Sequence, residues 1–192
     1  MPANALENSL AMSFPTQPAF TVFTKGWAPN LLVHPATKFL HEHEKVWDAK
    51  DYEASAAYYN LDVFTYVKST GQVFATGGLE QLQQDYGLFA AYYHEPIFGI
   101  VVEHADGNGW RVFGQAALFV DLPGPGGEKK HTDLSGREWE LRSEGAFIFD
   151  IEKADGAPHG LRFTYQQTFA DPTPFLGEAI KRGVIPIETL TA

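Results

Sequence analysis

The spacing of hydrophobic positions changes along the chain, from a helical period in the first half to strand alternation in the second. From His34 onwards the apolar residues share one helical stripe, which predicts a helix that ends at Asp48. A second short helix follows almost without a loop. Two short strands and a third helix come next. The second helix covers residues 51–60, the two strands cover 63–69 and 72–76, and the third helix covers 79–93.

The second half of the chain has the pattern of a sheet. Four longer β-type runs, with turn-rich connections between them, occupy residues 96–104, 110–122, 138–152 and 160–170. Uninterrupted alternation would place Phe147 and Phe149 on one face of their strand. It would likewise place Phe163, Tyr165 and Gln167 together on one face of the last strand.

These elements predict an α+β fold with a single main domain. Residues 1–33 are rich in proline and lack sustained periodicity, so we expect an N-terminal arm, followed by one domain over 34–192. The opposite faces of the middle strands are also partly apolar, at positions such as Phe113 and Ile148, which a solvated face would not need. Either a second copy of the chain packs there in a homodimer, or the arm covers these positions.

Composition and charge narrow the class of partner. The formal net charge is -10 and the sequence pI is near 5.1, so a nucleic-acid backbone or an anionic membrane surface would repel the chain. No apolar run approaches the roughly 20 residues that span a bilayer, and the first residues lack the pattern of a signal peptide. We therefore expect a soluble, cytoplasmic protein with neither nucleic-acid nor membrane partners.

No cofactor motif stands out in the sequence. The chain has no cysteine, which excludes thiolate chemistry and cysteine-ligated metals. The glycines over 71–78 lack the Walker lysine and the dinucleotide spacing, so they indicate turns rather than a phosphate cradle. His41 and His43 lie about 200° apart around a helix and cannot chelate one metal together. We expect neither a cofactor nor a metal.

The order of elements, which is two helices, a hairpin, a helix and a four-stranded meander, resembles that of the SnoaL-like or nuclear-transport-factor-two-like superfamily. The segments that carry the resemblance, within residues 35–183, are WDAKDYEA, VKSTGQVFATGGLEQL, DGNGWRVFGQAALFV and TFADPTPF. The resemblance implies a cone-shaped, curved antiparallel sheet wrapped around the N-terminal helices, a cavity between them, and frequent dimerisation through the sheet. Members range from dehydratases, isomerases and polyketide cyclases to proteins that only bind or scaffold.

Four residues are candidate catalytic groups. Asp48, Tyr66 and His94 fall near positions where scytalone dehydratase-type members, to which the chain is distantly similar, have a supporting acid, a pocket tyrosine and a histidine. His43 lies on the apolar stripe of the first helix, where a neutral imidazole can act as a general base near pH 7. A solvated or capping role for Asp48, and a satisfied core histidine at position 43, stay open as alternatives.

A further set of residues consists of candidate substrate-binding groups. Most are aromatic, which suits a hydrophobic ligand, and two of them also offer polar atoms for hydrogen bonds. The set comprises Trp47, Tyr58, Phe98, Phe147, Phe149, Phe163, Tyr165 and Gln167. Plain core packing is the rival explanation of the aromatic side chains.

Two hypotheses follow for the function. In the first, the protein is a cofactor-free isomerase, cyclase or dehydratase that acts on a hydrophobic, natural-product-like small molecule. A pericyclic mechanism is compatible with the few polar groups in the pocket. In the second, the same fold serves as a non-catalytic small-molecule binder or a dimeric scaffold. The resemblance to scytalone dehydratase is partial, because its second pocket histidine is replaced by residues such as Gly145 and Phe147, which argues against the same dehydration.

Overall fold

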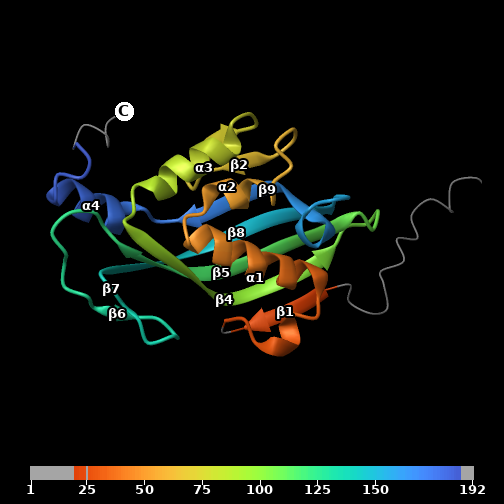
Figure 1. Ribbon diagram of the computed structural model, residues 1–192, viewed down its shortest axis with the longest axis horizontal. Coiled ribbons are helices and arrows are strands. Elements are labelled where there is room, and N and C mark those ends of the chain that lie inside the picture. Colours follow the sequence, from red (N-terminus) through yellow and green to blue (C-terminus); the bar gives the residue numbers. More distant parts are fainter. Residues whose placement is uncertain (1–19, 25, 187–192) are drawn as a thin grey trace, which may run out of the picture.

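The computed structural model describes residues 20–24 and 26–186, and a curved, unclosed sheet forms their centre (Figure 1). Seven strands lie in the order β1-β4-β5-β8-β9-β2-β3. All neighbouring strands pair antiparallel except β2 and β9, which run parallel. The strands are Phe20–Thr24 (β1), Thr65–Val67 (β2), Val73–Phe74 (β3), Ala91–Glu103 (β4), Gly109–Asp121 (β5), Leu141–Lys153 (β8) and Leu161–Ala170 (β9).

The helices pack against this sheet, and their order along the chain is the one predicted. Helix α1 contacts β4 and α2, α3 contacts β2, and α4 contacts β8. The α-helices are Pro35–Asp48 (α1), Tyr52–Ala56 (α2), Gly78–Gly87 (α3) and Thr173–Lys181 (α4), with short 3-10 turns at Pro29–Leu31 and Pro158–Gly160. The predicted α+β class is confirmed. Of the predicted arm, β1 forms an edge strand on β4, whereas residues 1–19 and 25 lie outside the described part of the chain.

Local chemistry sets the limits of α1. Pro35 occupies the first turn, where its missing N–H costs nothing, and the His34 side chain accepts a hydrogen bond from the Ala36 N–H at 3.2 Å. Asp48 is the last helical residue, and Lys50 then adopts a φ of 57° that turns the chain away. The apolar stripe faces the sheet and is buried, with Ala36, Phe39, Leu40, His43 and Trp47 among its members.

Helix α3 is shorter than the sequence spacing predicts. It ends at Gly87, and β4 begins at Ala91, so Tyr92 and His94 belong to a strand. Glycine is a weak helix former, which favours an end at this point. Tyr92 pairs with Val120 of β5 and is buried, so pairing in the sheet overrides the helical spacing at the end of the predicted helix.

Two β-bulges change which side chains of the sheet face the helices. In β4 the register with β5 shifts between Pro96 and Phe98. In β9 the register with β8 skips Thr164. A bulge adds one residue without a partner, so the alternation between the two faces of the sheet reverses beyond it.

The predicted faces of Phe98, Tyr165 and Gln167 are therefore wrong. Phe98 lies on the outer face of the sheet, away from α1, and is 37% exposed. The Tyr165 hydroxyl donates a hydrogen bond to Gln167 Oε1 at 2.7 Å on the same outer face. Gln166 is buried on the inner face instead. Strand β8 pairs with β5 without interruption, and Phe147 faces inward as alternation predicts.

A second, smaller layer covers part of the outer face. Strands β6 (His131–Thr132) and β7 (Glu138–Trp139) form a two-stranded sheet, and Trp139 packs with Ala117 and Phe119 of β5. The rest of the outer face carries apolar side chains that are between 37% and 46% exposed, namely Phe98, Val102, Phe113 and Phe169.

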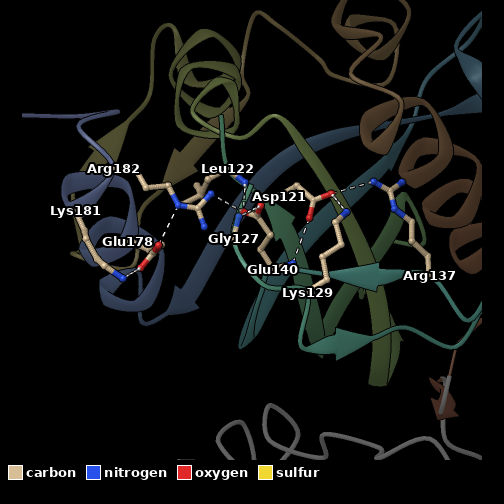
Figure 2. A network of polar contacts seen from close by, with 9 residues as sticks. All are labelled: Asp121, Leu122, Gly127, Lys129, Arg137, Glu140, Glu178, Lys181 and Arg182. Carbon is tan, nitrogen blue, oxygen red and sulfur yellow. Dashed lines mark hydrogen bonds and ion pairs between the residues drawn. The ribbon is translucent and has the colours of Figure 1, made fainter. Parts of the chain in front are cut away.

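A buried carboxylate joins this outer layer to the C-terminal helix (Figure 2). Glu140 accepts hydrogen bonds from the backbone N–H groups of Leu122 at 3.1 Å and Gly127 at 2.6 Å, and from the Arg182 guanidinium at 2.8 Å. Arg182 directly follows α4 and also donates to Glu178 at 3.0 Å. The segment between β5 and β6 is therefore tied to α4 through one side chain.

Candidate active site

A cavity lies between the helices and the inner face of the sheet. Its volume is about 110 Å³, and it is open to solvent at its mouth. Its apolar wall includes Leu40, Trp47, Leu82, Phe147, Phe149 and Phe175. Its polar wall includes His43, Glu44, Tyr59, Tyr86, His94 and Gln166.

The end of α1 and the start of β4 bring Asp48 and His94 together. The Asp48 carboxylate accepts the backbone N–H of His94 at 3.0 Å and lies 2.6 Å from its Nδ1. A carboxylate only accepts hydrogen bonds, so Nδ1 carries the ring proton and Nε2 keeps its lone pair. This pairing also holds the orientation of the ring and stabilises the imidazolium that forms when Nε2 takes a proton.

Tyr86 of α3 completes this chain of hydrogen bonds. Its hydroxyl lies 2.9 Å from His94 Nε2 and donates to the lone pair there. Burial, followed by smaller contributions from nearby tyrosine and aspartate side chains, raises the pKa of Tyr86 well above its ordinary value. Tyr86 is therefore a neutral hydrogen-bond donor at neutral pH.

His43 is a second histidine in the cavity wall, with a different character. Its Nε2 lies 2.9 Å from the Tyr59 hydroxyl, and its ring stacks on Trp47. Burial, with a smaller effect of His94, lowers the pKa of His43 to about 3. A neutral imidazole with so low a pKa is a weak base. The geometry matches the satisfied core histidine that the sequence left open as an alternative.

Glu44 also lines the cavity, one helical turn before Asp48. The Trp27 indole N–H donates to its Oε2. Burial, and then the charge of Asp48, raises the pKa of Glu44 well above its ordinary value, while the indole hydrogen bond acts in the opposite direction. The cavity therefore holds a carboxyl group that stays protonated more easily than a solvated glutamate.

Three predicted site residues lie elsewhere in the core. Tyr66 donates to Asp85 Oδ2 at 3.2 Å, and that carboxylate also pairs with a lysine and a glutamine. Tyr58 and Phe163 pack around Phe39, with ring centroids 5.4 Å and 4.8 Å from it. The cavity wall formed by the described residues does not include Tyr66, Tyr58 or Phe163.

The structure does bring several predicted residues together. His43, His94, Trp47, Phe147 and Phe149 all line the cavity, and Asp48 lies directly behind His94.

Sequence reasoning missed other members of the wall, in particular Glu44, Tyr59, Tyr86 and Gln166. A signal was present for two of them. Glu44 is four residues before Asp48 and so shares its helix face. Tyr86 falls on the apolar stripe of α3. The bulge hides the orientation of Gln166, because alternation assigns it to the opposite face.

Within residues 20–24 and 26–186, no group of three or more His, Cys, Asp or Glu side chains is placed to hold a metal ion. No helix in the same part of the chain is both long and apolar enough to cross a membrane.

Comparison with known proteins identifies the fold. No family model matches the sequence, and no curated protein matches it either. The protein Aln2 from a Streptomyces species superposes with a TM-score of 0.55 at 19% identity, over 80% of this chain and 99% of that chain. An NTF-2-like protein of unknown function from Pseudomonas aeruginosa gives a TM-score of 0.50 at 15% identity, over 72% and 99%. The chain has the nuclear-transport-factor-two-like fold. The fold that the sequence resemblance implied is confirmed.

A protein assigned as a scytalone dehydratase, from Novosphingobium aromaticivorans, has the same fold. Its TM-score is 0.56 at 11% identity, over 74% of this chain and 86% of that chain. At such identities a nuclear-transport-factor-two-like structure shares architecture, and the reaction must be argued from the site itself.

Proposed function

We propose that the protein is a cofactor-independent enzyme that takes a proton from a hydrophobic small molecule bound in the cavity. The Asp48–His94 pair carries the proposal, because its oriented imidazole lies in the wall of a largely apolar pocket. The reaction class is dehydration, isomerisation or cyclisation, each of which uses such a base. The likeness in fold to a protein assigned as a dehydratase supports this class.

The arrangement favours proton transfer in two ways. Trp47, Phe147 and Phe149 surround the substrate with apolar surface, which strengthens electrostatic interactions inside the cavity. Asp48 supplies a fixed negative charge beside Nδ1, so the imidazolium that forms on proton uptake is paired from the start. The base is therefore prepared before the substrate binds.

Tyr86 determines how a substrate reaches the base. Its hydroxyl occupies Nε2 in the structure, so a substrate either displaces this hydroxyl or passes its proton through it. Tyr86→Phe separates the two routes. A rate that is unchanged or higher in the variant indicates displacement, and a loss of about 100-fold indicates that the hydroxyl takes part.

The Kemp elimination of 5-nitrobenzisoxazole tests the proposal directly. In this reaction the C3 proton passes to His94 Nε2, the N–O bond breaks, and the electron pair goes to the oxygen of a coloured phenolate. We expect wild-type protein to accelerate the reaction, and both His94→Gln and Asp48→Asn to lower the rate by about 100-fold or more. The probe is bicyclic and apolar, like the ligand that the cavity favours.

The chain offers a matched control for this experiment. His104 also contacts an aspartate, with Nε2 3.4 Å from Asp150 Oδ1, but neither residue lines the cavity described by the structure. His104→Gln should leave the rate unchanged. Equal rates in wild type, His94→Gln and Asp48→Asn, with 5-nitrobenzisoxazole bound by all three, would overturn the enzyme proposal in favour of a non-catalytic binder.

We also propose that the protein is a homodimer that packs through the exposed outer face of the sheet. Phe113 lies between Ile100 of β4 and Ile148 of β8 in the register, so the apolar positions there are contiguous across three strands. A contiguous apolar area of this kind supports an interface. We expect Phe113→Lys to convert dimer to monomer in sedimentation velocity. A monomeric wild type would refute the dimer.

A further inference from the structure

Glu44 and Asp48 lie one turn apart on α1, and their surroundings differ. Asp48 receives two N–H donors, both from His94. Glu44 receives one donor, the Trp27 indole, and no other hydrogen bond from the described residues reaches it. Two neighbouring carboxyl groups in a poorly solvated site do not both ionise readily, so the proton belongs on the one with fewer donors.

The other groups around Glu44 do not supply a competing positive charge. His43, on the same helix, is neutral and bonded to Tyr59. From β4, His94 is already paired with Asp48, and Tyr93 is a phenol whose own pKa is raised by burial and by Glu44 among other acids. Glu44 has no lysine or arginine among its described hydrogen-bond partners.

We propose that Glu44 is the general acid of the cavity, which donates a proton to the oxygen of the substrate while His94 removes a proton from its carbon. This inference rests on the proposed function and adds the second half of the proton transfer. Glu44 and His94 line the same cavity, from α1 and β4 respectively. The acid therefore comes from α1 and the base from β4. Different surroundings give the two groups different protonation states, as in other enzymes that use an acid and a base together.

In a dehydration, the proton that His94 removes and the proton that Glu44 donates are both accounted for. His94 Nε2 takes the proton from the carbon next to the one that bears the hydroxyl group. The C–O bond breaks, and the leaving hydroxyl takes the Glu44 proton and departs as water. Glu44 is left as a carboxylate and His94 as an imidazolium, and exchange with solvent returns one proton to Glu44 and takes one from His94. The substrate class is therefore a hydrophobic molecule with a hydroxyl or carbonyl oxygen near an acidic C–H bond.

Infrared difference spectroscopy tests the protonation state without any substrate. We expect the spectrum of wild type minus Glu44→Gln at pH 7 to contain the C=O band of a carboxylic acid. Glu42→Gln is the matched control, because Glu42 lies on the same helix and pairs with Lys45 at 2.9 Å. Its difference spectrum should contain a carboxylate band. A carboxylate band for Glu44 at pH 7 would overturn the inference and leave the His94 proposal untouched.

Two Kemp substrates then test the acid role. Unsubstituted 1,2-benzisoxazole releases a more basic phenolate than the 5-nitro compound does, so it gains more from an acid. We expect Glu44→Gln to slow 1,2-benzisoxazole at least about tenfold more than 5-nitrobenzisoxazole. An equal effect on both substrates would refute proton donation by Glu44. Loss of rate in His94→Gln is a separate result, so failure of the base and failure of the acid are distinguishable.

Discussion

Removing the Glu140 carboxylate should cost a large part of the stability of the protein. Its side chain is 4% exposed, and that of its partner Arg182 is 11% exposed. Glu140→Ala deletes three charge-assisted hydrogen bonds at once (Figure 2). It leaves the N–H groups of Leu122 and Gly127 without their acceptor, and it leaves Arg182 with Glu178 as its remaining carboxylate partner. The Arg182 guanidinium is poorly solvated, so the loss of folding stability exceeds the loss from breaking a surface ion pair.

The magnitude follows from the burial of the pair. Breaking a buried ion pair by removing one partner costs about 3–5 kcal/mol. Hydrogen bonds to a charged group contribute about 1.5–3 kcal/mol each, but these overlap with the ion pair and do not add to it in full. Because Arg182 keeps its ion pair with Glu178, we expect a loss at the low end of this range, about 3 kcal/mol, against a total stability of about 5–15 kcal/mol for a domain of this kind.

Urea unfolding followed by tryptophan fluorescence measures the loss, with the slope of the transition held common to all variants. Glu128→Ala is the matched control, because Glu128 lies close by in the chain and pairs with Lys130 at 2.8 Å while 77% exposed. Its midpoint should not change measurably. Equal midpoints for Glu140→Ala and Glu128→Ala, or a loss below about 1 kcal/mol for Glu140→Ala, would refute the argument from burial.

Other perturbations have defined outcomes as well. Tyr59→Phe removes the partner of the buried His43 imidazole and should lower the free energy of unfolding by about 1–3 kcal/mol in urea. Because folding lowers the pKa of His43 from 6.5 to about 3, the unfolded state binds more protons between these values, and stability falls as the pH is lowered through them. Wild type should lose up to about 1.4 kcal/mol per pH unit more than His43→Gln between pH 6 and 4, and parallel curves would contradict this. Gly114→Ala would place a Cβ in steric overlap with Phe147 Cζ and should lower Tm, whereas Gly177→Ala, with open space in α4, should raise it. A Tm for Gly114→Ala at or above that of wild type would count against the close approach.

Much of the fold was predictable because the signals are local. The stripe of α1, the proline at its start and the alternation along β8 each express a single element, and the structure follows them. The end of α3 was not predictable from the helical period, since Tyr92 lies within the predicted helix in the sequence but pairs with Val120 of β5 in the structure.

The candidate site was less predictable, because it depends on distant pairing. Asp48 and His94 are joined only when β4 packs on α1, and the expectation that they belong together came from the resemblance, not from their spacing. The bulge at Thr164 has no sequence signal, since threonine is an ordinary strand residue. Pro96 was a usable signal for the bulge at Ile97, because proline within a paired strand is found at bulges. Glu44 carried a usable signal in its spacing from Asp48, which a search for apolar stripes alone ignores.

The bulge in β9 allows the cavity wall to change in two ways during evolution. A point substitution alters one group in the wall. Closing the bulge without deleting a residue, so that Thr164 pairs with Asp150, would restore plain alternation: Gln166 and Thr168 would leave the cavity while Tyr165 and Gln167 would turn into it. A shift of one residue in register would thus replace the polar side chains on this strand together, with no change in length, and a new ligand preference would arise in a single event.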